Sequence, residues 1–443
     1  MSDTNFAKIF FRYALPGISG MVAISLYILA DTYFISSGLG SIGVTALNLA
    51  IPVFSLVHGS GLMLGMGGGA KYSVLSGNGK SGGASACLFS SLTAAVPFCT
   101  VFLFSGLFFS YDIALFLGAD RFALDYTAVY VKVILLFSPA FILNDIFQSF
   151  VRNDGNPELA MSAMITASFS NIILDYIFIF PLGLGMFGAV LATGLSPVIG
   201  IAVLSLHIFS RKRNLVFKPS RPDLKIFADI FSVGAPSFFT EMSSGIVIAV
   251  FNSVIFRISG NTGIAAYGII ANISLVVVAV FTGLSQGMQP LLSREFGRDN
   301  FSGCMKILKL ASLSALFIAV IFYTAIFSFA SPITALFNKE NNVLLSDMAL
   351  TGLRIYFAGV FFAGFNIVVS VFFSTCGKTL AAQLISLARG FFVIIPASVI
   401  LSTLFGMVGV WLSFPVTEAL VTLVFCFSAF LFRLFSSKHK LKK

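Results

Sequence analysis

The sequence predicts an all-α integral membrane protein with twelve transmembrane helices in two pseudo-symmetric six-helix bundles. Three observations carry this prediction. The chain of 443 residues is 58% hydrophobic and only 10% charged, whereas soluble domains are about 45–50% apolar and about 25% charged. Twelve apolar segments are long enough to cross a bilayer, and the second half of the chain repeats a pattern of the first half.

The twelve apolar segments follow one another with short polar breaks. A helix needs about 20 apolar residues to cross the hydrocarbon core. The breaks are rich in glycine or charge, as in S-G-N-G-K-S-G-G at 76–83 and N-D-G-N-P at 153–157. The segments that qualify are 14–37, 44–70, 85–109, 126–150, 158–181, 186–209, 231–257, 263–290, 307–330, 350–374, 381–404 and 407–432.

The basic residues indicate the orientation. Most of the 27 Lys and Arg residues fall in the N-terminal segment, in every second loop and in the C-terminal tail. Cytoplasmic loops carry an excess of Lys and Arg, so we expect both termini in the cytoplasm. The net charge of +10 then reflects topology, and we expect no nucleic-acid partner.

An internal repeat divides the chain near its longest basic loop. We expect an N-terminal lobe at 1–210, a cytoplasmic linker at 211–225 and a C-terminal lobe at 226–443. Glycine and proline fix backbone geometry, and parallel repeats of this kind are common in transporters. The matched pairs are Pro16 with Pro236, Gly40 with Gly260, Gly67 with Gly287, Gly77 with Gly297, Asn144 with Asn366, Gly155 with Gly377, and G-M-F-G (185–188) with G-M-V-G (406–409).

Polar side chains inside the predicted spans mark a candidate site. A charged residue at the centre of a membrane helix costs about 2.5–3.5 kcal/mol on insertion scales. Asn171 and Asp175 are four apart and share one helix face. Asp31, Asp175 and Thr193 each lie about six or seven residues from the external end of a span, which is roughly 10 Å deep. The alternative is that both aspartates are interfacial residues in contact with water.

A shared site of this kind could work in two ways. Two nearby carboxyl groups can share a proton. Carboxylate, amide and hydroxyl oxygens can instead replace the hydration shell of Na⁺, as they do for other hard cations. Asn144 and Asp145 could supply a further oxygen, and Tyr27 lies one turn before Asp31 on the same face.

Glu241 stands alone near the middle of the seventh span, and its repeat partner is Met21. An acid at this depth would attract a cationic substrate or carry a proton. The alternative is a structural ion pair with a basic residue such as Arg389. His58 is expected to be a satisfied core residue.

The sequence contains no motif that favours an enzyme. G-M-G-G-G-A at 65–70 lies inside a span and follows no strand, so close helix packing explains it better than nucleotide binding. We expect no cofactor, no ATP-driven step and no catalytic residues.

Together these segments resemble the MATE (multidrug and toxic compound extrusion) transporters, and in particular the bacterial subgroup that includes the staphylococcal multidrug exporter. The resemblance covers essentially the whole chain. It is carried by the first-span pattern from Pro16 to Asp31, G-V-T-A-L-N-L-A-I-P (43–52), N-I-I-L-D (171–175), G-A-V-L-A-T (188–193), P-S-F-F-T-E (236–241) and C-G-K (376–378).

The resemblance implies a V-shaped pair of six-helix bundles that exports amphipathic organic cations by antiport with Na⁺ or H⁺. It assigns the coupling ion to Asp31, Asn171 and Asp175, joined by Thr193 and Asn144, with Na⁺ possible at Asp31, Asn171, Asp175 and Thr193. It assigns the substrate cavity to Tyr27, Met164 and Glu241. The family often has proline directly after the fifth-span aspartate, where this chain has Tyr176, so a bend at this point is not expected.

The resemblance further implies multidrug efflux, and hence antibiotic resistance, by a multi-pass monomer in the lipid of the bacterial cytoplasmic (inner) membrane. The main rival is a lipid-linked saccharide flippase of related architecture, although the acids within the spans favour cationic cargo. A receptor or scaffold without transport activity is a second rival. The sequence leaves the choice between Na⁺ and H⁺ open.

Overall fold

The computed structural model describes residues 3–79, 81–210, 214–215, 223–338 and 342–440. Most of the expected linker at 211–225 therefore lies outside the described residues. The first half holds α1 (Asp3–Gly77), α2 (Ser81–Phe108), α3 (Ser110–Phe116), α4 (Leu124–Leu136), α5 (Ser138–Asn153), α6 (Pro157–Ile179), α7 (Gly185–Ser205) and η1 (Leu206–Phe209). The second half holds α8 (Leu224–Gly297), α9 (Phe301–Phe337), α10 (Val343–Tyr356), η2 (Phe357–Gly359), α11 (Val360–Thr375), α12 (Thr379–Leu387), the π-helical η3 (Ala388–Phe392) and α13 (Ile394–Lys440).

Two of these helices, α1 and α8, are long enough to cross a membrane twice, and so is the segment Thr379–Cys426, which consists of α12, η3 and most of α13. Each is broken by a glycine with positive φ: Gly40 in α1 (69°), Gly260 in α8 (59°) and Gly406 in α13 (58°). Only a residue without Cβ adopts this conformation readily. The described residues form eight span-length apolar helices, and the bent pair of α4 and α5 makes a ninth. With three of the nine crossing twice, the chain crosses twelve times.

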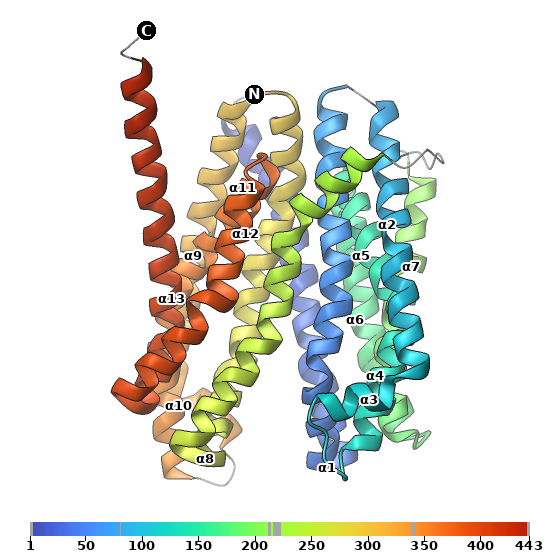
Figure 1. The fold of residues 1–443 in the computed structure, drawn as a ribbon, viewed down its shortest axis with the longest axis vertical. Coiled ribbons are helices and arrows are strands. Elements are labelled where there is room, and N and C mark those ends of the chain that lie inside the picture. The colour runs from blue at the N-terminus through green and yellow to red at the C-terminus, as the bar shows by residue number, and fades with distance from the viewer. Residues whose placement is uncertain (1–2, 80, 211–213, 216–222, 339–341, 441–443) are drawn as a thin grey trace.

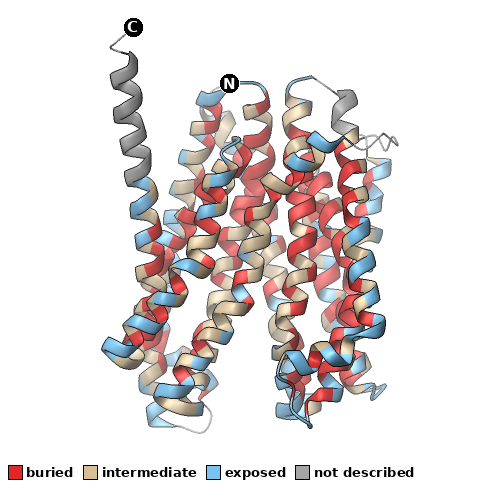
Figure 2. Cartoon of the chain, in the orientation of Figure 1, coloured by how far each residue is buried: buried red, intermediate tan, exposed pale blue. Residues whose placement is uncertain are grey.

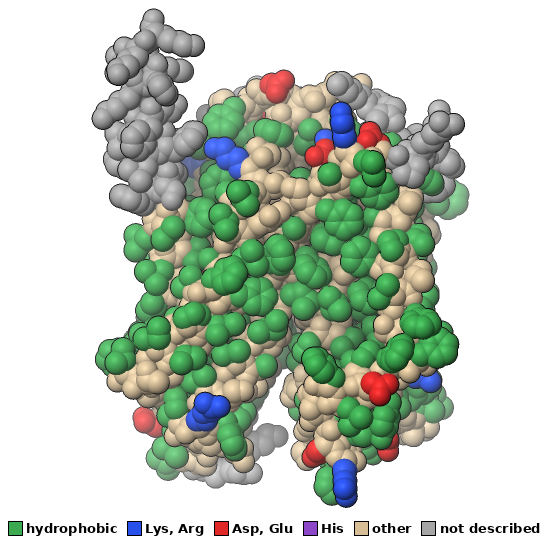
Figure 3. Space-filling model, in the orientation of Figure 1, with side chains coloured by type: hydrophobic (Ala, Val, Ile, Leu, Met, Phe, Trp, Pro, Cys, Tyr) green, Lys and Arg blue, Asp and Glu red, His purple; other side chains and the backbone are tan. Residues whose placement is uncertain are grey.

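The helices form two groups that stand side by side, α1 to α7 and α8 to α13 (Figure 1). Each group has its own hydrophobic core. Val131, Ile142 and Phe150 belong to the first core, and Phe357 and Trp411 belong to the second. Buried residues run through both groups (Figure 2). Large apolar side chains cover the outer surface (Figure 3), as expected for a surface in contact with lipid.

The repeat predicted from the sequence is visible in the backbone. Matched glycines adopt the same left-handed conformation: φ is 69° and 59° at Gly40 and Gly260, 94° and 78° at Gly155 and Gly377, and 58° at both Gly185 and Gly406. Each pair therefore turns the chain at equivalent places in the two groups.

Glycines also close the contact between the two groups at the end where α1 begins and α13 ends, which we call the termini end (Figure 1). A Cβ added at Gly67 would lie 2.0 Å from Ile230 O, and one at Gly287 would lie 2.5 Å from Tyr13 O. Such distances are far shorter than a van der Waals contact, so these positions need glycine. The backbones of α1 and α8 therefore touch at this end.

Polar contacts reinforce the same contact. Arg152 Nη1 donates to Gln286 Oε1 at 2.6 Å, and Asn153 Nδ2 donates to Gln289 Oε1 at 3.0 Å. Lys71 forms an ion pair with Asp229. The opposite end differs, because Figure 3 shows a hollow between the two groups there. A groove between α1 and α8 is lined by residues that include Pro52, Gly245 and Arg257. The molecule is thus closed at the termini end and open at the other.

Asp154 fixes the part of the linker that the structure describes. Its carboxylate accepts hydrogen bonds from Tyr72 Oη at 2.5 Å, His207 Nε2 at 2.8 Å and the backbone N–H groups of Asn214 and Leu215, both at 3.0 Å. Burial raises the pKa of Asp154, but these hydrogen bonds together outweigh it and hold the pKa below its usual value. Asp154 therefore stays ionised and ties the start of the linker to the first group.

We expect Gly67→Ala combined with Gly287→Ala to open the termini end. Overpacking typically costs about 1–3 kcal/mol, which is roughly a 5-fold to 150-fold change in the ratio of closed to open molecules. Spin labels are placed on the exposed positions Asn78 and Arg298 in a variant without other cysteines. Double electron–electron resonance should then show an additional, longer distance between the two labels. The matched control is Gly268→Ala, because a Cβ there meets no atom within 4 Å. An unchanged distance distribution in the double variant would contradict this role of the two glycines.

Candidate functional site

Two acids from different helices meet inside the first group. α1 carries Asp31 and α6 carries Asp175, with exposed fractions of 5% and 0%. Their carboxyl groups lie within hydrogen-bond range of each other. The Oδ1 atom of each acid has no hydrogen-bond partner among the described residues. Both acids are therefore buried, so the interpretation of interfacial residues in contact with water does not fit this structure.

Asn171 and Thr193 complete this cluster. With its amide nitrogen turned toward Asp175, Asn171 donates to Asp175 Oδ2 at 3.1 Å and accepts from the backbone N–H of Thr193 at 3.2 Å. Thr193 Oγ1 donates to Ala189 O at 3.2 Å. The hydroxyl of Tyr130, on α4, also lies within hydrogen-bond range of the Thr193 side chain. Tyr130 was missed by the sequence analysis, because a tyrosine in an apolar span gives no distinct signal.

The cluster has the chemistry of a site for a small cation. Two carboxyl groups in contact can share one proton, or their free oxygens can face a bound cation. Neutral oxygens of Asn171 and Thr193 border the pair. Among the described residues no three His, Cys, Asp or Glu side chains have the arrangement of a metal site. The oxygens of Asp31, Asp175, Asn171 and Thr193 are donors of the kind that bind a proton or a hard cation such as Na⁺.

Two other predicted residues lie apart from this cluster. The Asn144 side chain packs against Gly200, where an added Cβ would lie 2.5 Å from Asn144 Oδ1. Gly200 is seven residues from Thr193 on α7, or roughly 10 Å along the helix. Met164 is buried against Gly20, where an added Cβ would lie 2.4 Å from its sulfur. Met164 thus offers almost no exposed surface in this conformation.

Glu241 pairs with a histidine. Its Oε1 lies 3.4 Å from His58 Nδ1, and His58 Nε2 lies 3.6 Å from Asp145 Oδ1. His58 was expected to be a satisfied core residue, yet it lies between two acids. Asp145 and His58 belong to the first group of helices and Glu241 to the second, so this cluster bridges the two groups.

Tyr27 lies near both clusters. It is partly buried on α1, one turn before Asp31. Four carboxylates, two from each cluster, act electrostatically on its hydroxyl: Asp31, Asp145, Glu241 and Asp175. Both clusters therefore lie close to the Tyr27 hydroxyl.

Arg389 pairs with Glu418 and not with Glu241, the partner considered in the sequence analysis. Its Nε donates to both carboxylate oxygens of Glu418 at 2.8 and 2.9 Å, and its Nη2 donates to Glu418 Oε1 at 2.7 Å. Asn366 Nδ2 donates to Glu418 Oε2 at 2.7 Å. The suggested pair of Glu241 with Arg389 is therefore wrong.

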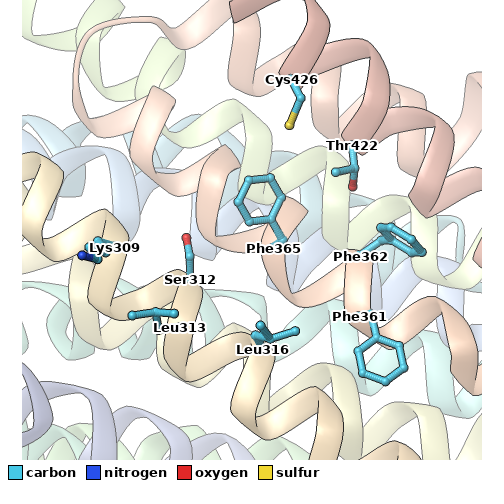
Figure 4. A pocket seen from close by; sticks show the side chains of 9 residues that line it. All are labelled: Lys309, Ser312, Leu313, Leu316, Phe361, Phe362, Phe365, Thr422 and Cys426. Carbon is cyan, nitrogen blue, oxygen red and sulfur yellow. The ribbon is translucent and has the colours of Figure 1, made fainter.

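A second groove lies between α9, α11 and α13 in the second group (Figure 4). Its lining is mostly apolar and includes Leu316, Phe361 and Phe365, with Lys309 as its charged member. No acid is among its lining residues, so a cation in this groove would meet aromatic rings but no carboxylate.

Comparisons with known proteins identify the family of this chain. The MatE family model matches residues 16–177 and 236–400. The multidrug export protein MepA of Staphylococcus aureus (strain NCTC 8325 / PS 47) is 28% identical over 430 residues, which cover 96% of this chain and 94% of MepA. A crystal structure of a MATE protein in complex with MaL6 superimposes with a TM-score of 0.88 at 25% identity, covering 94% of each chain.

A further solved structure has the same fold. The outward-facing conformation of a multidrug resistance MATE family transporter of the MOP superfamily superimposes with a TM-score of 0.88 at 23% identity, covering 94% of this chain and 93% of the other. These similarities confirm the predicted all-helical membrane fold with twelve transmembrane helices.

Proposed function

Because this chain belongs to the MatE family of multidrug efflux transporters, we propose that it exports amphipathic organic cations by antiport with Na⁺ or H⁺. It is a membrane transporter and not an enzyme. One observation carries the proposal of cation coupling: Asp31 and Asp175 come from two helices and meet, buried, beside Asn171 and Thr193. Burying two acids side by side is costly unless a cation or a proton joins them.

Alternating access requires two bodies that move. We propose that these are residues 1–210 and 226–443, which rock about the glycine contact at the termini end. With both termini in the cytoplasm, the hollow in Figure 3 faces outward. Ion binding at the acids then favours one arrangement and substrate binding favours the other, as coupling requires.

The substrate class follows from the charges near the hollow. Glu241 has an exposed side-chain fraction of 28% and borders the space between the groups, and Tyr27 lies next to it. Phe54 and Phe238 supply aromatic rings close by. Acids attract a cation, and aromatic faces bind both its charge and its apolar body. A flippase for anionic lipid-linked sugars would need the opposite polarity here.

The test is uptake of ethidium into everted vesicles, in which the cytoplasmic face points outward. Vesicles are loaded either with Na⁺ or with acid, so that each gradient drives its ion out separately. We expect one gradient to drive ethidium into the lumen, and that gradient identifies the coupling ion. Equal uptake with neither gradient, with Na⁺ and with acid would contradict cation-coupled export.

A further inference from the structure

We propose that His58, Asp145 and Glu241 form a second cation site, in which the protonated His58 side chain holds the place of the organic cation and gives up its proton when that cation binds. This inference rests on the proposed export of organic cations. It adds His58 to the substrate site and a step to transport, because the organic cation would bind by replacing the positive charge of the protonated His58 side chain.

The position of the cluster supports this role. The groove between α1 and α8 is lined by Pro52 and Gly245. His58 follows Pro52 by six residues on α1, and Glu241 precedes Gly245 by four residues on α8. Both therefore lie about one to two turns deeper than these lining residues. A cation that enters from the open end would meet His58 and Glu241 at the inner end of the groove.

The sequence around His58 allows both acids to approach. It reads H-G-S-G at 58–61. A Cβ at Gly61 would lie 2.4 Å from Asp145 Oδ2, so only glycine leaves room for this carboxylate. A Cβ at Gly59 would lie 3.4 Å from Glu241 Cβ, in close contact. Gly59 and Gly61, which follow the histidine in this segment, thus let a helix from each group come near.

The imidazole ring is fixed in place between the acids. It stacks on Phe54 with centroids 5.7 Å apart and an interplanar angle of 11°. Phe54 in turn packs edge-on against Phe141 at 5.6 Å. Each ring nitrogen faces one acid, at 3.4 and 3.6 Å. A protonated ring would therefore face a carboxylate on each side without moving.

The negative charges of Asp145 and Glu241 are only partly compensated by positive or hydrogen-bonding groups other than His58. Asp145 has an exposed fraction of 6%, and its Oδ2 has no hydrogen-bond partner among the described residues. The other charged group that acts on it is Arg152, which donates to Gln286. The hydroxyl of Tyr27 also lies near both acids. One imidazolium between two carboxylates leaves a single negative charge, whereas a neutral imidazole leaves two.

Exchange follows from this charge balance. When an organic cation pairs with Glu241 and Asp145, a positive charge on His58 would be repelled. Its N–H proton then passes to water in the hollow, no electron moves, and the total charge of the site is unchanged. Because the pair of His58 with Glu241 joins α1 to α8, the exchange also removes a charged link between the two groups.

The test measures proton release on binding of tetraphenylphosphonium, a cation that does not titrate. Calorimetry of the purified full-length transporter in two buffers of different ionisation enthalpy counts the protons released. We expect up to one proton per bound cation in the wild type, and an affinity that rises by up to tenfold per pH unit over the range in which His58 of the unbound protein is protonated. In His58→Asn both the release and this pH dependence should disappear, while Asp112→Asn, a change at an exposed aspartate on α3, should keep them.

Glu241→Gln provides a second variant that does not depend on how well His58→Asn folds. It should bind tetraphenylphosphonium more weakly and release fewer protons. Binding by the wild type without proton release, or equal release by His58→Asn, would overturn the inference and leave the proposed export intact. A wild type that neither binds this cation nor moves ethidium under either gradient would instead count against the proposed function.

Discussion

Asp175→Asn is expected to abolish ion-driven efflux while the protein stays folded. The substitution keeps the size of the side chain and its contact with Asn171, but it removes one of the two carboxylates that face each other. Removing one partner of a buried charged pair costs about 2–5 kcal/mol, which is roughly 30-fold to 4,000-fold in affinity for the ion. Ethidium uptake into Na⁺-loaded or acid-loaded everted vesicles measures the loss.

Two further variants make this prediction specific. Asp31→Asn should have an effect of similar size, because the two acids share one ion. Asp112→Asn is the matched control, since Asp112 is an exposed aspartate on the short helix α3, and it should transport at the wild-type rate. If Asp175→Asn still transports under both gradients, the pair with Asp31 does not couple the ion, and the cluster around Glu241 becomes the leading candidate.

Glu418→Gln should destabilise the second group of helices by about 3–5 kcal/mol, because it leaves the guanidinium of Arg389 buried without a negative partner. The side chains of Arg389 and Glu418 are exposed by only 12% and 4%. The double variant Arg389→Gln with Glu418→Gln should recover much of this loss, since it removes both charges. The free energy of unfolding, measured by titration with a denaturing detergent, gives the size of each effect.

A matched control is available at the surface. Arg12 and Glu158 form an ion pair at 2.9 Å whose side chains are exposed by 53% and 43%. An exposed pair of this kind contributes about 0–1 kcal/mol, so Glu158→Gln should change the free energy of unfolding little. Equal effects of Glu418→Gln and Glu158→Gln would show that the buried pair is no more important for stability than the surface pair.

Much of the fold could be predicted from the sequence because the bilayer imposes simple rules. Length and apolarity identify the spans, and the predicted breaks contain Gly40, Gly260 and Gly406, where the structure has left-handed backbone. The repeat predicted Gly67 and Gly287 as equivalents, and both lie at the contact between the groups. A glycine that fixes backbone geometry leaves a signal in the sequence whatever its neighbours are.

The candidate site could be predicted only in part. Depth along a helix follows from counting residues, so Asp31, Asp175 and Thr193 were expected at one level, and the structure brings them together. Asn144 also lies in a span, but its helix is rotated so that the side chain packs on Gly200. Counting residues does not determine which way a helix is rotated.

The sequence by itself determined the membrane class, the twelve crossings and the internal repeat, because each depends on composition, length or spacing along the chain. Only the tertiary structure decided which side chains are partners. In the structure His58 lies between Asp145 and Glu241, and Arg389 forms an ion pair with Glu418. These contacts join residues far apart in the chain, and they depend on how each helix is rotated and packed against its neighbours, which no local pattern records.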